Sequence, residues 1–202
     1  MSRVLTCLVM SVVLVLSLAV ACQVEQVHVR GVPSGITPHV LTVTVPDGAT
    51  VTVRMIGRSP VVMAVRQAEL AAVTLGRYIG TTAQQQSDGT LEAMGVVVFP
   101  DSERGMSEGQ VAWDLGHNSS MTHAVVTDLV LSPEGRKLTL TYRGGETQVV
   151  VPARVPIASS QRADKRLLQL GAPVFIRANQ QPDGSLTAAR VFVGIDGFVP
   201  LL

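Results

Sequence analysis

A stretch of 25 residues occurs twice in this chain in closely similar form, and this repeat limits the possible folds. The chain reads LGRYIGTTAQQQSDGTLEAMGVVVF from Leu75 to Phe99, and the phrase returns without gaps as LGAPVFIRANQQPDGSLTAARVFVG from Leu170 to Gly194. The Asp88-Gly89 and Asp183-Gly184 pairs are typical of hairpin turns, and a shared turn alone would mean little. A gapless match over 25 positions instead predicts that one sheet-forming unit was duplicated.

Each copy also contains an earlier hairpin pattern. In LTVTVPDGATVTVRM, from Leu41 to Met55, a three-residue loop at Pro46-Asp47-Gly48 places every apolar residue on one face. In LTLTYRGGETQVVV, from Leu138 to Val151, a two-residue turn at Gly144-Gly145 has the same effect and pairs the first residue with the last. Because a one-residue slip would exchange the two faces, the alternation favours these pairings.

These patterns indicate an all-β protein, because short alternating runs are separated by turn residues throughout. A leading segment and two hairpins give each copy about five strands. A sheet of five strands can shield its apolar face from water by closing into a barrel. We therefore expect two tandem small β-barrels, OB-like or SH3-like. The predicted boundaries are a signal peptide at 1–21, a first barrel at 22–99, an inter-repeat loop at 100–121 and a second barrel at 122–202.

The N-terminus predicts export. Arg3 precedes an apolar run from Val4 to Val20, and Ala19-Val20-Ala21 is a small-x-small cleavage signal. The run is short for a membrane span, which ranks an uncleaved anchor lower. The residues before Cys22 resemble a bacterial lipobox, so we expect a periplasmic protein anchored in a membrane through a lipidated Cys22. A plainly secreted chain with a free thiol is the alternative.

Composition excludes several partners. Lys and Arg total 16 while Asp and Glu total 15, so the chain has no general attraction to nucleic acid or anionic lipid. One Trp, two Tyr and four Phe are too few for a base-stacking platform, and we expect no nucleic-acid partner. Loss of Cys7 with the signal leaves Cys22 as the only cysteine, so no intrachain disulfide can form.

The inter-repeat loop holds the candidate metal ligands. His117, Met121 and His123 lie within seven residues, and Met106 and Asp114 are near. Imidazole and thioether ligands in an exported protein suit copper better than zinc or magnesium, which makes copper the possible cofactor. In the alternative interpretation Met121 packs at the junction of the barrels, both His residues are solvated and the protein has no cofactor.

The same loop contains the single tryptophan. Trp113 is predicted to anchor a protein partner if it is exposed, or to hold the two barrels together if it is buried. Burial is favoured because Val111 and Leu115 flank it at the even spacing of a strand face.

The loop could also supply the residue types of a catalytic triad. Ser119 or Ser120, with His117 and Asp114, has the right composition, but no G-x-S-x-G elbow is present. We therefore expect that the protein is not an enzyme.

The loop motifs FPDSERG, EGQVAWDL and SSMTHA, with the PDGSLTAARV ending, resemble a family of small exported proteobacterial proteins made of tandem β domains of unknown function. The resemblance covers nearly the whole mature sequence and implies export and a double β fold, without an established activity. Gln110 stands where that family frequently has His, and His123 where it frequently has Asn. Some members are described as metal transporter permeases, which does not suit a mature sequence without an apolar run of spanning length.

Together these patterns predict a non-enzymatic β-domain protein of the cell envelope that binds an envelope protein partner or has a structural role. Periplasmic copper binding through the His and Met residues of the inter-repeat loop is the alternative function.

Overall fold

The structure, a computed structural model, describes residues 25–57, 60–133 and 135–200. Its strands are β1 (Gln26–Ile36), β2 (Val40–Thr44), β3 (Thr50–Met55), β4 (Val61–Ala68), β5 (Tyr78–Gln85), β6 (Leu91–Val98), β7 (Gly109–Ala112), β8 (Ser119–Ser132), β9 (Gly135–Tyr142), β10 (Gly145–Pro152), β11 (Ile157–Ala163), β12 (Val174–Gln180), β13 (Leu186–Ala188) and β14 (Arg190–Gly194). Single 3-10 turns lie at η1 (Leu70–Ala72), η2 (Asp101–Glu103) and η3 (Lys165–Leu167). The all-β prediction is confirmed for this part of the chain.

The predicted signal peptide at 1–21 and the lipidation site Cys22 lie outside the described residues. Across the ranges that the structure does describe, no helix is both long and apolar enough to span a membrane.

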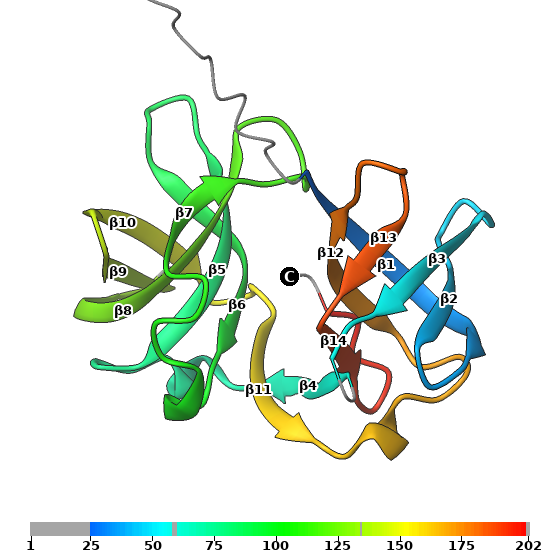
Figure 1. The fold of residues 1–202 in the computed structure, drawn as a ribbon. Helices are drawn as coiled ribbons and strands as arrows, with labels where there is room; N and C mark the ends of the chain where they lie inside the picture. The colour runs from blue at the N-terminus through cyan, green and yellow to red at the C-terminus, as the bar shows by residue number, and fades with distance from the viewer. Residues whose placement is uncertain (1–24, 58–59, 134, 201–202) are drawn as a thin grey trace, which may run out of the picture.

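Ten strands form two closed five-stranded barrels, which lie side by side in Figure 1. Barrel I is the ring β1–β2–β3–β13–β12, closed by pairing of β12 with β1. Barrel II is the ring β8–β9–β10–β6–β5, closed by pairing of β5 with β8. In each ring one pair is parallel, β3 with β13 and β10 with β6. This closure confirms the prediction of small β-barrels, and the ring order is the OB-like one.

The two copies of the repeat exchange their second hairpins. Barrel I takes β1 to β3 from the first copy but β12 and β13 from the second, and barrel II takes β5 and β6 from the first copy but β8 to β10 from the second. The barrels therefore differ from the predicted boundaries of 22–99 and 122–202, since each contains residues from both ranges. The exchanged hairpin is almost the same in both copies, so it meets an equivalent apolar face in either position.

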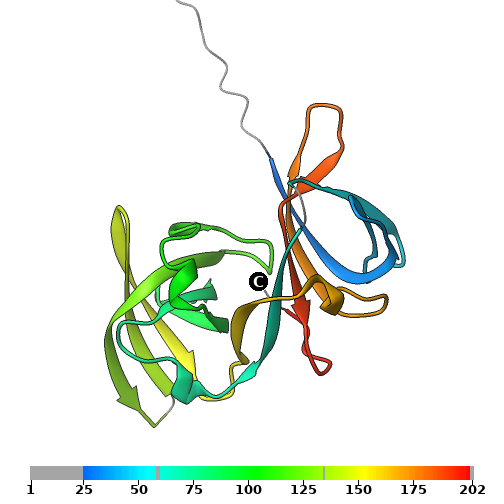
Figure 2. The same ribbon diagram turned by 60° about the horizontal axis from the view of Figure 1, so that its bottom comes forward.

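An extended crossover in each copy carries the exchange. β4 and β11 run antiparallel to each other between the barrels, from the pair Val62–Ala163 to the pair Ala68–Ile157 (Figure 2). Val65 pairs with Ser160, which is its own counterpart 95 positions later in the aligned repeat. The approximate two-fold axis that relates the copies therefore passes through this pair.

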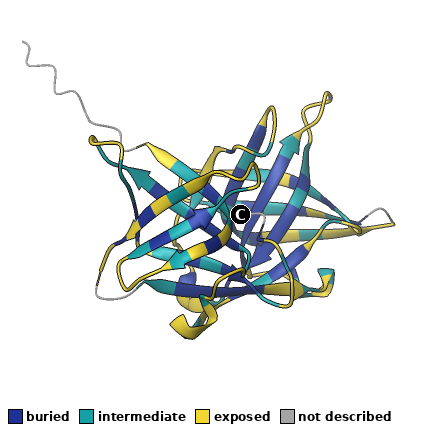
Figure 3. Ribbon diagram, turned by 90° about the vertical axis from the view of Figure 1, so that its right-hand side faces the viewer, coloured by how far each residue is buried: buried dark blue, intermediate teal, exposed yellow. Residues whose placement is uncertain are grey.

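Three apolar clusters fill the molecule. Two of them occupy the barrel interiors, one around Ile176 and Val43 in barrel I and one around Leu138 and Leu140 in barrel II. The third lies between the barrels and is the most aromatic. Figure 3 shows buried residues alternating with more exposed ones along the strands, as period-two side-chain direction requires.

The hairpin turns follow the sequence signals with one difference. Pro46-Asp47-Gly48 forms the predicted three-residue loop, with Val45 bonded to Ala49 by an N–H···O bond of 2.9 Å. In the second copy the turn lies at Arg143-Gly144, not at Gly144-Gly145, because Tyr142 pairs with Gly145. Gly144 supplies the left-handed residue, with φ of 94°. The register is thus shifted by two residues from the predicted one, which keeps every side chain on its predicted face.

Candidate functional site

The strands of barrel I present a polar and aromatic face to the space between the barrels. Ile176 and Ala178 on β12 are buried inside barrel I, whereas Phe175 and Arg177, which alternate with them, face outward. Arg190 on the neighbouring β14 faces the same space. The segment between the repeats, residues 100–118, covers this face and is called the inter-repeat segment below.

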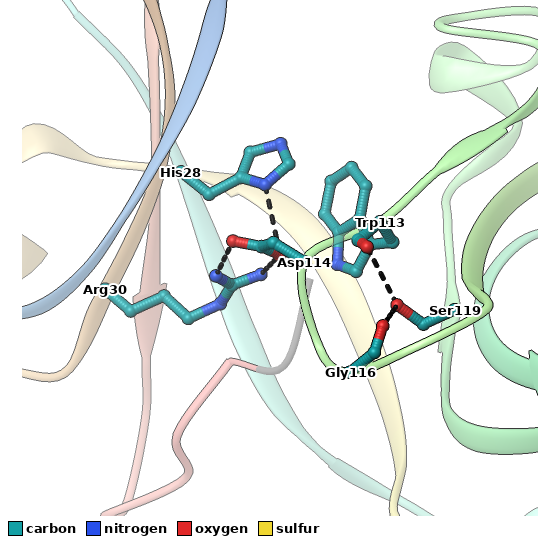
Figure 4. A network of polar contacts seen from close by, with 6 residues as sticks. All are labelled: His28, Arg30, Trp113, Asp114, Gly116 and Ser119. Atoms are coloured by element: carbon teal, nitrogen blue, oxygen red, sulfur yellow. Dashed lines mark hydrogen bonds and ion pairs between the residues drawn. The ribbon is translucent and has the colours of Figure 1, made fainter.

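An ion-pair cluster ties the inter-repeat segment to barrel I (Figure 4). The Asp114 carboxylate accepts two hydrogen bonds from the Arg30 guanidinium, at 2.7 and 2.8 Å, and lies 3.1 Å from Nδ1 of His28. Burial opposes ionisation of Asp114, but the hydrogen bonds and charges of Arg30 and His28 outweigh it and lower its pKa. The bidentate geometry fixes the segment over β1.

Trp113 lies beside this cluster, between the barrels. Its side chain is 9% exposed, and its ring centroid is 3.9 Å from that of His28 and 6.2 Å from that of Phe175. The Ser119 hydroxyl lies 2.8 Å from the carbonyl oxygen of Trp113 and 2.9 Å from that of Gly116, which fixes the turn that follows the tryptophan (Figure 4). The indole therefore packs against the outer face of barrel I.

Two further contacts anchor the first part of the segment. The buried Glu103 carboxylate accepts a hydrogen bond from the Arg190 guanidinium, forming an ion pair that bridges η2 and β14. The Tyr78 hydroxyl donates to the carbonyl oxygen of Met106 at 2.6 Å. Burial, followed by the charge of Glu108, raises the pKa of Tyr78 to about 12, so the phenol stays neutral and remains a donor.

These contacts border a partly open cavity of about 230 Å³ between the barrels. Its lining residues are Gln26, Ile56, Arg177, Asn179, Ala188, Ala189, Arg190 and Phe192 from the side of barrel I, and Tyr78, Phe99, Glu103, Met106, Ser107, Trp113, Met121 and His123 from the side of barrel II and the inter-repeat segment. Four of these sixteen residues are aromatic. The wall thus combines aromatic and other apolar side chains with charged and amide groups, as a site that orients a small molecule does.

One positive charge of the cavity has no negative partner. Arg177 is half-buried, its guanidinium donates to the Ser107 hydroxyl, and no carboxylate within the described ranges lies in ion-pair distance of it. Burial, and then the charge of Arg190, lowers its pKa. Burial, and then the charge of Arg177, lowers the pKa of His123 to about 4, so this imidazole is neutral near pH 7.

The structure brings three of the four predicted metal ligands to this cavity. Met106, Met121 and His123 line it, whereas His117 is exposed in the inter-repeat segment and is not among the lining residues. In the described part of the chain no group of three His, Cys, Asp or Glu side chains is placed to hold a metal ion. Copper also takes thioether ligands, and its binding stays a prediction.

The residues of the considered triad have other contacts. Ser119 hydrogen-bonds to backbone carbonyls, and the Asp114 carboxylate is taken by Arg30 and His28. The carbonyl of His117, and not its imidazole, is the group that contacts the Gln84 amide.

Reasoning from sequence missed the arginines of the cavity. Arg177 aligns with Thr82, and Arg190 aligns with Gly95, inside the gapless repeat. The sequence did contain a signal for these arginines: at both positions one copy has a charged residue where the other has a small one. Glu103 was visible only as one of several acidic residues in the inter-repeat segment, and nothing local pointed to Arg190 as its partner.

No family model matches the chain, and comparisons with curated proteins and with solved structures find no match either. The chemistry of the cavity is therefore the basis for a functional assignment.

Proposed function

We propose that the protein is a non-enzymatic binding protein of the cell envelope that takes up a small molecule in the cavity between its barrels. The cavity carries this proposal, because both barrel interiors are filled with apolar side chains while 230 Å³ remains open between them. The inter-repeat segment adds walls to this space that the barrels alone would lack. Binding is favoured over catalysis because Ser119 and Asp114 already have structural partners.

The envelope location is proposed from the N-terminal sequence, through cleavage after Ala21 and lipidation of Cys22. Under this proposal Cys22→Ser moves the protein from the membrane fraction to the soluble fraction of the envelope. Unchanged fractionation would remove the anchor and leave the pocket unaffected.

The binding test uses Trp113 as reporter, since it is the single tryptophan of the sequence and lines the cavity. Purified protein is titrated with three single-ring compounds, benzoate, benzamide and benzyl alcohol, while indole emission is followed. We expect a saturable change with at least one of them. Ala189→Phe, which adds a ring at the cavity wall, should abolish it, while Ala49→Phe in the exposed β2–β3 loop should not. No saturable response to any compound would contradict the proposal.

Copper is the second candidate ligand, favoured by the arrival of Met106, Met121 and His123 at one cavity. The unpaired charge of Arg177 acts against a cation there. Stoichiometric Cu(I) uptake that is lost in the His117→Ala, Met121→Ala, His123→Ala triple variant would favour copper over the small molecule. Uptake that the triple variant retains would reject these ligands.

A further inference from the structure

Three arginines face the inter-repeat segment, Arg30 on β1, Arg177 on β12 and Arg190 on β14, and the segment supplies a carboxylate to only two of them. It supplies a carboxylate to Arg30 through Asp114, and a carboxylate to Arg190 through Glu103. To Arg177 it supplies only the neutral hydroxyl of Ser107. A guanidinium keeps its charge when it is buried, and a buried charge without a counter-charge is unfavourable. The segment thus leaves one fixed positive charge at the wall of the cavity.

The fold does not require a cation at this place. In the aligned repeat, Arg177 corresponds to Thr82, which occupies the same position on β5 as Arg177 does on β12. Thr82 is buried on the outer face of barrel II and needs no counter-charge there. Since the same backbone accepts a threonine, packing alone does not explain the arginine.

The charges around the cavity add up to one unit. Arg190 and Glu103 form an ion pair and neutralise each other. Arg177 is then the remaining charge among the ionised side chains of the cavity wall. A single positive charge is matched by a monoanion, whereas a phosphate carries about 1.5 to 2 negative charges at pH 7.

The remaining walls set the shape of the ligand. The rings of Phe99, Trp113 and Phe192 line the cavity, and the amide of Asn179 lies near Arg177 on the same face of β12. The cavity is smaller than the range of about 300–1,000 Å³ that holds drug-sized ligands. It therefore has room for one ring or a short branched body, and not for a nucleotide or an oligosaccharide.

We propose that the cavity binds a small monocarboxylic acid, with the carboxylate held by the Arg177 fork and the apolar body between the aromatic side chains. This inference rests on the proposed function, because it names the ligand class of the same cavity. A guanidinium presents two parallel N–H donors that match the two oxygens of a carboxylate, which a point charge does not. The Ser107 hydroxyl occupies one donor direction and holds the fork toward the cavity.

Calorimetry with three probes tests the inference on the purified protein. Benzoate and benzamide share a ring and differ in charge, and inorganic phosphate carries the charge without the ring. We expect benzoate to bind at least about tenfold more tightly than benzamide. A charge-assisted hydrogen bond from Arg177 to the carboxylate contributes a difference of this size. Equal binding of benzoate and benzamide would overturn the carboxylate inference and leave the proposed function standing. Phosphate binding in place of benzoate would overturn it too.

Variants of Arg177 identify the group responsible. Arg177→Thr copies the other repeat and should lower benzoate affinity at least about tenfold while benzamide affinity is unchanged. Arg177→Lys keeps the charge without the fork and should fall between the two. Arg154→Thr, at an exposed loop position away from the cavity, is the matched control and should change nothing. Unchanged benzoate binding by folded Arg177→Thr and Arg177→Lys proteins would overturn the assignment, and failure of all probes would overturn the proposed function as well.

Discussion

The outer faces of the two barrels occupy equivalent places in the repeat but carry different side chains. On barrel I the antiparallel pair β1–β12 sets His28 opposite Arg177, and on barrel II the equivalent pair β8–β5 sets Met121 opposite Thr82. In the same alignment Arg190 stands where the other copy has Gly95. The compared positions are charged on barrel I, and they hold small or apolar side chains on barrel II.

The two faces also differ in the space that they leave. Beside Gly80, Thr82 and Gly95 the face of barrel II holds a void of only 10 Å³, at most about the room of one water molecule. A Cβ added at Gly80 would lie 2.9 Å from the Phe99 ring, so this face is closely packed. Duplication thus supplied two equivalent surfaces. The cavity of 230 Å³ lies where the inter-repeat segment covers the face of barrel I, and residues of barrel II complete its wall.

The fold constrains the barrel interiors more than the outer faces. The barrel interiors are alike in both copies, because each needs apolar residues at the same alternate positions. The outer faces had no such common requirement. The charges on the side of barrel I are paired by the covering segment, which brings Asp114 to Arg30 and Glu103 to Arg190.

Removal of the Glu103 carboxylate should have the largest effect on this difference. Glu103→Gln leaves the Arg190 guanidinium, whose side chain is 22% exposed, without its counter-charge. We expect a loss of about 3–5 kcal/mol in the free energy of unfolding, the range for breaking one side of a buried ion pair. Denaturant titration measures it, with Glu69→Gln at an exposed position as control.

A second substitution at Arg190 separates a lost ion pair from general damage. In the Glu103→Gln, Arg190→Ala double variant no unpaired charge remains, so stability should recover in part toward that of the unmodified protein. Additive losses in the double variant would mean that the two side chains act independently. The stability of the protein would then not depend on the pairing of charges at the face of barrel I.

The second largest effect should be a loss of stability at acid pH, through His123 at the cavity. His123 has a pKa of about 4 in the folded protein, below the ordinary value of 6.5, because of burial and then the charge of Arg177. The unfolded chain therefore binds the proton first as the pH falls, and stability is lost between about pH 6.5 and pH 4. The expected loss from this group is at most about 3 kcal/mol.

The measurement compares the pH dependence of unfolding in the unmodified protein and in His123→Asn. Other carboxyl and imidazole groups titrate in both proteins, so the difference between the two curves reports His123. The variant should be flatter between pH 6.5 and pH 4. Parallel curves would show that the imidazole is not held neutral beside Arg177.

Alternation and turn chemistry predicted much of the fold. The loop at Pro46-Asp47-Gly48 and the pairing of Val43 with Val51 were predictable because every apolar side chain must reach one face. The shift at Arg143-Gly144 was not, since a slip of two residues keeps the faces and the apolar pattern cannot detect it. The structure shows Gly145 beneath the Tyr142 ring, a local contact that the alternation does not encode.

The exchange of hairpins and the cavity could not be predicted from the sequence for a related reason. Both copies offer the same apolar partners, so the pattern cannot tell whether residues 75–99 close their own barrel or the other one. That choice depends on β4 and β11, which pair with each other across the axis. Arg177 and Ser107 are 70 positions apart and meet only through this exchange.

The smallest expected effect comes from the parts of the copies that ought to be interchangeable. The loops at Ser87-Asp88-Gly89 and Pro182-Asp183-Gly184 have the same backbone hydrogen bonds. In each, the N–H of the glutamine before the loop donates to the carbonyl of the residue after Gly, and the Gly N–H donates to the carbonyl of that glutamine. Ser87→Pro therefore places proline where its counterpart already has it. We expect a gain of about 0.4–1 kcal/mol, because proline restricts the unfolded chain.

Thermal unfolding of Ser87→Pro and of the reverse variant, Pro182→Ser, tests this equivalence directly. The first should melt a few degrees higher and the second a few degrees lower, with nearly equal shifts because the two loops share one geometry. In both loops the Asp side chain also accepts the backbone N–H of the residue after Gly, at 2.9 and 3.0 Å. A destabilised Ser87→Pro would mean that the copies differ even in their turns, and the contrast between conserved loops and divergent outer faces would no longer hold.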